Sequence, residues 1–156
     1  NNQQALYSRA LAYEKQGNIS EMSQDFEKMI SFDPYNSIAL NAYGYSLTLQ
    51  NTNLELAEEL IRRAINIDPG NAAIIDSLAW VLYLGGNYEQ AYTYASLAYS
   101  KDQDPEIVQH YYIILMKNGL KDEANNVIEE SVKENPNNES LMKLLENHKN
   151  DELSKL

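Results

Sequence analysis

The sequence contains no cysteine, which excludes disulfide bonds and thiolate metal sites. It has no apolar run of the roughly 18 residues that a membrane-spanning helix needs, so we expect no membrane insertion. Basic side chains are scarce, because 12 lysines and arginines stand against 23 acidic residues, for a net charge of −11. A nucleic-acid-binding surface needs clustered cationic side chains, so this balance argues against a nucleic-acid partner.

The start of the chain lacks two further features. It has no initiator methionine, and no basic stretch is followed there by an apolar segment. We therefore find no secretory signal, and the missing methionine is typical of a piece of a longer protein. The compartment is unknown from the sequence, with cytoplasmic and periplasmic or envelope locations equally open.

Turn residues are few but regularly spaced. An interval of about 34 residues separates the members of one series, which consists of Gly17, Asn51, Gly86 and Gly119. The same interval separates Met22, Ala57, Ala91 and Ala124, and it also separates Pro34 from Pro69. Three markers that agree on one period predict a repeat architecture.

Each repeat contains the pattern of two helices. In the third repeat, Ile75, Leu78 and Leu82 follow helical spacing, Gly85-Gly86 interrupts it, and a second apolar stripe begins at Tyr88. The predicted units cover about 3–36, 37–71, 72–104 and 105–137. A further amphipathic segment at about 138–150 predicts a capping helix, because the last repeat of a solenoid otherwise exposes its apolar face.

The segment from Asp76 to Ala91 carries the best match to a known repeat. It resembles the tetratricopeptide repeat, whose pattern is W-x2-L-G-x2-Y, then A-x3-F, then P, and it is similar to the bacterial form. The resemblance implies an all-α fold, a right-handed α-α superhelix (solenoid) of about four helix-turn-helix repeats with a C-terminal capping helix. It also implies a single domain over residues 1–156.

Small residues are expected where paired helices approach closely. Gly44 and Ala79 occupy such positions on the first helices of their units. Tyr112 stands at the corresponding position of the fourth unit, where the family prefers Gly or Ala. We expect this side chain to push the two helices of that unit apart unless a small neighbour makes room.

No catalytic or metal-binding constellation is present. His110 and His148 lack zinc-ligand spacing and are expected at the surface or in a groove. Ser77 has no histidine placed to activate it, and no phosphate-binding glycine motif occurs. The acidic run Asp102–Glu106 is best interpreted as a linker followed by a helix N-cap. We expect no enzyme activity, no cofactor and no metal.

The resemblance implies a concave groove formed by the first helices of successive units, in which a protein or peptide partner lies. The groove positions carried over to this chain are Tyr7, Leu11, Glu14, Asn41, Tyr45, Thr48, Asp76, Trp80, Tyr83, Gln109, Ile113 and Met116. Among these, Tyr45, Trp80 and Tyr83 lie off the core stripe without an obvious packing role, so we expect them to contact a partner. The alternative is that they pack against neighbouring first helices and stiffen the superhelix, and Trp80 is suited to both roles. Exposed Trp and Tyr are typical of binding hot spots.

One type of family ligand is not expected. Members that clamp a C-terminal carboxylate do so with Lys, Asn and Arg side chains on the first helices. The matching positions here include Tyr7, Leu11, Ala42, Ala73 and Ser77, so no clamp is present. The aromatic, amide-rich and mildly acidic groove favours an apolar or basic peptide or helix.

Two alternatives to a protein-interaction scaffold remain. An uncapped first helix that begins at Leu6 favours self-assembly into a homodimer through the N-terminal end. The chain is also consistent with the repeat portion of a longer multidomain protein or enzyme, such as a transferase.

Overall fold

The computed structural model describes residues 2–153, and the side chains of 151–153 are excluded from the description. The predicted domain limits at 1 and 156, together with 154–155, lie outside the described residues. Within the described part the fold is all-α, with nine helices and no strand. In chain order they are α1 (Gln3–Lys15), α2 (Ile19–Phe32), α3 (Ser37–Leu49), α4 (Leu54–Ile67), α5 (Ala72–Leu84), α6 (Tyr88–Lys101), α7 (Pro105–Lys117), α8 (Lys121–Glu134) and α9 (Glu139–Leu153).

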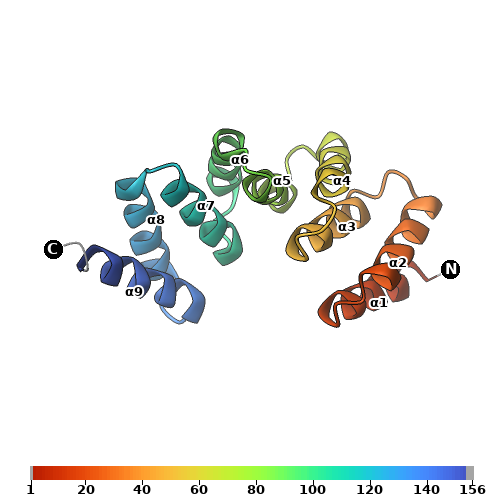
Figure 1. Cartoon of the computed structure of the whole chain (residues 1–156), viewed down its shortest axis with the longest axis horizontal. Helices are drawn as coiled ribbons and strands as arrows, with labels where there is room; N and C mark the ends of the chain where they lie inside the picture. The colour runs from red at the N-terminus through yellow and green to blue at the C-terminus, as the bar shows by residue number, and fades with distance from the viewer. Residues whose placement is uncertain (1, 154–156) are drawn as a thin grey trace.

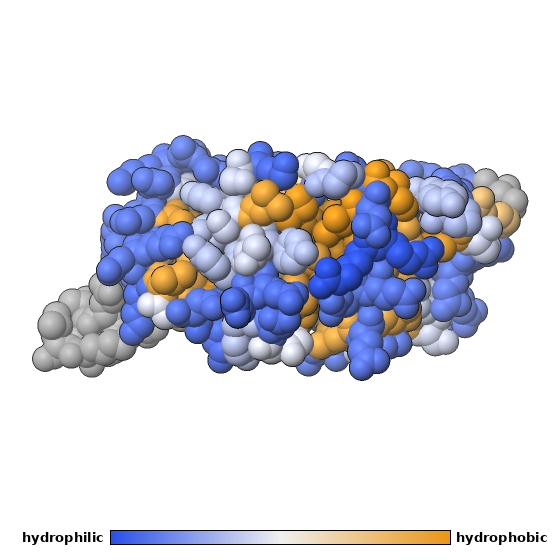
Figure 2. Space-filling model, turned by 90° about the horizontal axis from the view of Figure 1, so that it is seen from above, coloured by the Kyte–Doolittle hydropathy of each residue, from blue (hydrophilic) through white to orange (hydrophobic). Residues whose placement is uncertain are grey.

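The helices form an arched superhelix (Figure 1). The odd-numbered helices line its lower, concave side in that view, and the even-numbered helices α2 to α8 form the outer side. Figure 2 looks onto the outer side, where hydrophilic side chains cover both ends and hydrophobic ones gather toward the middle.

Short polar residues set the helix starts. The side chains of Asn36, Asn71 and Asn87 each accept a hydrogen bond from a backbone N–H in the first turn of the helix that follows. Asp104 does the same before α7, where Pro105 occupies the first helical position. The interpretation of the acidic run as a linker and N-cap is therefore confirmed.

The turns inside the helix pairs use left-handed backbone. Gly17, Gly86 and Gly119 have φ angles of 73°, 83° and 78°, which residues with a Cβ atom rarely adopt. Asn51 takes the corresponding place between α3 and α4 with φ 48°, and asparagine is among the residues that tolerate it best. The series of turn residues found by spacing thus marks the reversals of the chain.

Close helix approach explains Gly44. A Cβ at this position would lie 2.6 Å from Cγ1 of Ile61 and 2.8 Å from the backbone oxygen of Ala57. Both contacts come from α4, so α3 and α4 touch where only hydrogen fits. Ala79 is fully buried at the corresponding position of α5, as expected.

The fourth pair of helices accommodates Tyr112 as expected. Its ring is buried, and its hydroxyl lies 2.9 Å from Nδ1 of His148 on α9. α7 and α8 pack less extensively on each other than the two helices of the earlier pairs do. The aromatic ring is therefore accommodated by contact with the closing helix α9, and by less extensive packing within its own pair.

Both histidines are buried and line neither of the cavities described below, so the expectation that they lie at the surface or in a groove is wrong. His148 on α9 is buried against the ring of Tyr112. His110 is buried between the concave side and the core. Spacing alone could not show this, because each imidazole is covered by a helix about one repeat away.

Candidate partner-binding groove

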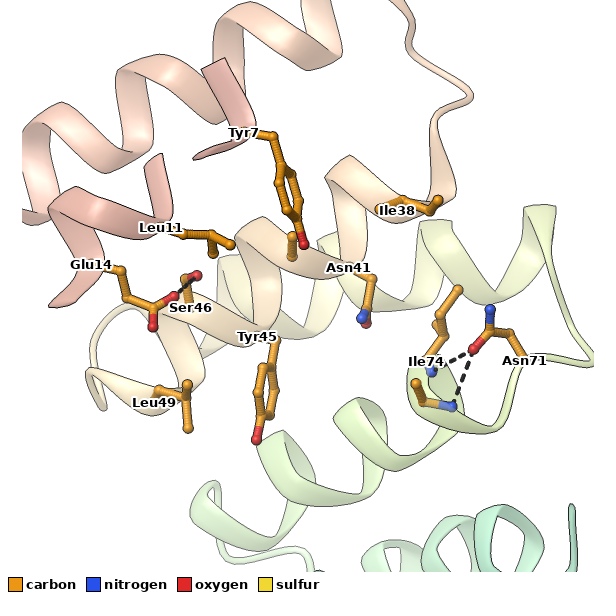
Figure 3. A pocket seen from close by; sticks show the side chains of 12 residues that line it. Tyr7, Leu11, Glu14, Ile38, Asn41, Tyr45, Ser46, Leu49, Asn71 and Ile74 are labelled. Atoms are coloured by element: carbon orange, nitrogen blue, oxygen red, sulfur yellow. Dashed lines mark hydrogen bonds between the residues drawn. The ribbon is translucent and has the colours of Figure 1, made fainter. Parts of the chain in front are cut away.

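A cavity of about 360 Å³ opens on the concave side between α1, α3 and the start of α5. Figure 3 shows the side chains around it, with Tyr7 and Leu11 from α1 and Asn41 and Tyr45 from α3. These four predicted groove residues are therefore brought together. Glu14, also predicted, lines the same cavity, where its carboxylate accepts a hydrogen bond from the Ser46 hydroxyl.

Helix periodicity explains this lining. Asn41 and Tyr45 are one turn apart on α3, and the same face carries Ile38 before them and Leu49 after them. Ile38 and Leu49 are 66% and 48% exposed, large values for aliphatic side chains, yet they were absent from the predicted set. The i, i+3, i+4 spacing from Asn41 and Tyr45 was a signal that could have found both residues.

Thr48 was wrongly placed in the groove. Its side chain is fully buried, and its hydroxyl donates a hydrogen bond to the backbone oxygen of Gly44 at 2.8 Å. The Thr48 hydroxyl thus bonds to the backbone carbonyl one turn earlier in the same helix and does not face a ligand.

A second cavity, of about 260 Å³, adjoins the first and is strongly acidic. The two share three lining residues, Asn41, Tyr45 and Ala73. Four carboxylates line the second cavity, and they belong to Asp76, Asp102, Asp104 and Glu106. The sequence showed acidic density between 102 and 106, but not that the turn before α7 folds beside α3 and α5.

Asp76 is buried in the wall of the second cavity. It is 4% exposed, and one carboxylate oxygen lies 2.7 Å from Nδ1 of His110. Burial raises the pKa of Asp76, the nearby imidazole of His110 counters this, and the charges of Glu106 and Asp104 add to the rise. Its other carboxylate oxygen, Oδ1, is buried and has no hydrogen-bond partner among the described residues.

Tyr45 connects the two cavities. Its hydroxyl donates a hydrogen bond to Glu106 across the groove, from α3 to the start of α7. Burial raises the pKa of Tyr45, and the negative charge of Glu106 raises it further, so the phenol stays protonated as the donor. The edge of its ring also approaches His110, with centroids 6.3 Å apart.

Trp80 and Tyr83 are half-buried and have clear packing partners, which favours the alternative that they stiffen the superhelix, while contact with a partner stays a prediction. The indole of Trp80 stacks on His110 with centroids 4.1 Å apart and on Tyr83 at 5.0 Å. Tyr83 in turn contacts the ring of Tyr88 on α6. This aromatic stack joins α5 to α6 and α7, and Trp80 and Tyr83 line neither of the two cavities.

The remaining predicted residues come from α7. Gln109, Ile113 and Met116 are half-buried, and the last two pack against the core. None of the three lines either cavity. Of the predicted groove residues, the two cavities therefore include those from α1, Asn41 and Tyr45 from α3, and Asp76 from α5, but neither Thr48 nor those further along the chain.

The described residues contain neither a metal-binding group nor a membrane-spanning helix. No group of three or more His, Cys, Asp or Glu side chains in this part of the chain is arranged to hold a metal ion. None of the helices in residues 2–153 combines the length and the apolar character needed to cross a membrane.

Comparison with known proteins agrees with this architecture. A sequence model of the tetratricopeptide repeat matches residues 3–36. A TPR repeat-containing protein of Pseudomonas aeruginosa is 35% identical over 105 residues, which cover 67% of this chain and 18% of that protein. The chain thus spans less than a fifth of the length of this relative.

Solved structures share the fold. A thermophilic TPR protein of Thermus thermophilus superposes with a TM-score of 0.85 at 19% identity, covering 95% of this chain and 81% of that one. PilF of Pseudomonas aeruginosa gives a TM-score of 0.82 at 22% identity, with 97% and 69% covered. With the repeat period, the helix pairs and the matching family, these likenesses show that the chain belongs to the tetratricopeptide-repeat family.

Proposed function

We propose that this chain holds a segment of a partner protein in the part of the concave groove formed by α1, α3 and the start of α5. Tetratricopeptide repeats are in general scaffolds for protein interactions and not catalysts, so the fold favours a protein partner. The groove location within this chain is our own proposal.

The exposure of Ile38 and Leu49 is the observation that carries it. Both aliphatic side chains line one cavity together with Tyr7, Leu11 and Tyr45 while remaining 66% and 48% exposed. An apolar, aromatic cavity rimmed by Asn41 and Glu14 suits a peptide that presents an apolar anchor and backbone amides.

The test uses peptides selected on the protein. A phage library of random peptides is panned on the immobilised chain, and the affinities of selected peptides are measured by fluorescence polarisation. Ile38→Asp should weaken binding by about tenfold or more, because it puts a charge into the apolar anchor site. Leu97→Asp is the matched control, since Leu97 is also an exposed apolar residue but lies on α6 and lines neither cavity.

Selected peptides should bind wild type and Leu97→Asp alike. If selected peptides bound Ile38→Asp as tightly as wild type, the binding site would have to lie elsewhere on the chain. Failure to select any peptide that competes for this groove would contradict the proposal as well.

A further inference from the structure

Three of the four carboxylates that line the second cavity accept hydrogen bonds but have no cationic partner among the described side chains, whereas the fourth, Asp76, pairs with His110. Glu106 accepts a hydrogen bond from the Tyr45 hydroxyl, Asp104 accepts one from the backbone N–H of Glu106 in the first turn of α7, and Asp102 accepts one from the backbone N–H of Asp104. In residues 2–153 the ion pairs are Arg9–Asp25, Arg62–Glu58 and His110–Asp76. No lysine or arginine of the described chain therefore neutralises this cavity, which concentrates negative charge beside low-dielectric walls.

Two buried oxygen atoms in the cavity walls also lack partners. Oδ1 of Asp76 and Oδ1 of Asn41 have no hydrogen-bond donor among the described residues, and the Asp76 side chain is 4% exposed. Both residues line the acidic cavity. Because a buried acceptor without a donor costs free energy, the site favours a ligand that brings several N–H groups.

The chemistry of that ligand follows from the donor set. A metal ion would need several ligands on one point, and the described residues hold no such group. A guanidinium is planar, carries five N–H donors and stacks on aromatic rings, so it can serve spread carboxylates, amide oxygens and Tyr45 together. An ammonium has three donors around a single point and fits this spread less well.

We propose that the acidic cavity binds the arginine side chain of a partner peptide, next to an apolar residue of the same peptide in the first cavity. This inference rests on the proposed function and names the chemistry of the partner. The shared wall of Asn41, Tyr45 and Ala73 makes the two cavities neighbours along one peptide.

The probe for the test is N-acetyl-arginine methylamide, titrated into the full chain and followed by two-dimensional ¹H–¹⁵N NMR. We expect the probe to bind with a millimolar dissociation constant. Saturable chemical-shift changes should then cluster on the backbone amides of Ala73, Ser77 and Ile107, which line the cavity. The citrulline analogue, which has nearly the same shape and no charge, should produce no such cluster, and the lysine analogue should bind at least several-fold more weakly.

Variants separate the cavity from the general acidity of the chain. Glu106→Gln keeps a hydrogen-bond acceptor for Tyr45 and should weaken binding of the arginine probe by about tenfold. A folded Asp76→Asn variant should lose a similar amount of affinity. Glu59→Gln removes the same charge from an exposed position of α4 that does not line the cavity, and should change affinity by less than about twofold.

Three results would overturn the inference: equal binding of the lysine or citrulline analogue, shift changes spread over all acidic surfaces, or a Glu106→Gln affinity equal to that of Glu59→Gln. Its failure is distinguishable from failure of the proposed function. Selected peptides that depend on Ile38 but contain no arginine would leave the groove proposal standing and remove the arginine site alone.

Discussion

At the scale of single residues, the packing partners of Trp80 give this aromatic side chain a structural role that its place in the repeat pattern left undecided. Its indole lies between His110 and Tyr83, and His110 in turn bonds to Asp76 in the wall of the acidic cavity. A residue that the repeat pattern places in a binding groove thus supports the position of a groove carboxylate. Any effect of Trp80 on binding would have to be separated from this structural role.

Trp80→Ala should lower the free energy of unfolding by about 2–4 kcal/mol, because it removes buried ring area and two aromatic contacts. Urea unfolding followed by circular dichroism measures this, since the chain has a single tryptophan and its fluorescence would be lost. Trp80→Phe is the control and should retain most of the stability. A loss below about 0.5 kcal/mol for Trp80→Ala would show that the ring is free for a partner, as first predicted.

At the scale of elements, the contact between α3 and α4 depends on Gly44. Alanine is normally the better helix residue by about 1 kcal/mol, yet a Cβ here would collide with Ile61 and with the backbone of Ala57. Since a backbone atom cannot rotate away, α4 must shift, and overpacking of this kind costs about 1–3 kcal/mol.

Gly44→Ala should therefore be destabilising overall by up to about 2 kcal/mol in urea unfolding, because the overpacking cost exceeds the gain in helix propensity. Gly70→Ala is the matched control, because a Cβ at Gly70 would meet no atom within 4 Å and the glycine lacks a positive φ. We expect Gly70→Ala to change stability by less than about 0.5 kcal/mol. Equal stability of the two variants would mean that α3 and α4 are not held at this close approach.

At the scale of the whole molecule, the homodimer through the N-terminal end stays a prediction. The structure buries Ala10 completely and half-buries Leu6 and Tyr13 against the core. The Arg9–Asp25 ion pair also links α1 to α2, and the Arg9 guanidinium holds the pKa of Asp25 below its ordinary value. The N-terminal end is therefore less apolar than the sequence pattern indicated.

Light scattering after size exclusion, over a range of protein concentrations and salt, tests the homodimer. Each chain has a net charge of −11, so a dimer should tighten as added salt screens the repulsion. Leu6→Glu should dissociate it, and Leu97→Glu, on α6, should not. A monomer mass at every concentration and salt level would contradict the homodimer.

The sequence by itself determined the family and the local architecture. The spacing of Gly17, Asn51, Gly86 and Gly119 located turns that need left-handed backbone, and the small residue at Gly44 marked a close helix approach. These features could be found because each depends on local backbone geometry or on a period repeated within the chain. Tyr7, Leu11, Asn41 and Tyr45 were also placed together correctly, since helix periodicity and stacking of neighbouring units suffice for that.

The tertiary structure alone decided which candidate residues pack and which face the groove. Trp80 and Tyr45 occupy equivalent places in the sequence pattern, but His110 from the next unit covers one, and Glu106 from two units on bonds to the other. Both contacts join residues far apart in the sequence, and burial and pairing depend on which side chains the superhelix brings together. The acidic cavity arises in the same way, from a turn before α7 folded against α3 and α5.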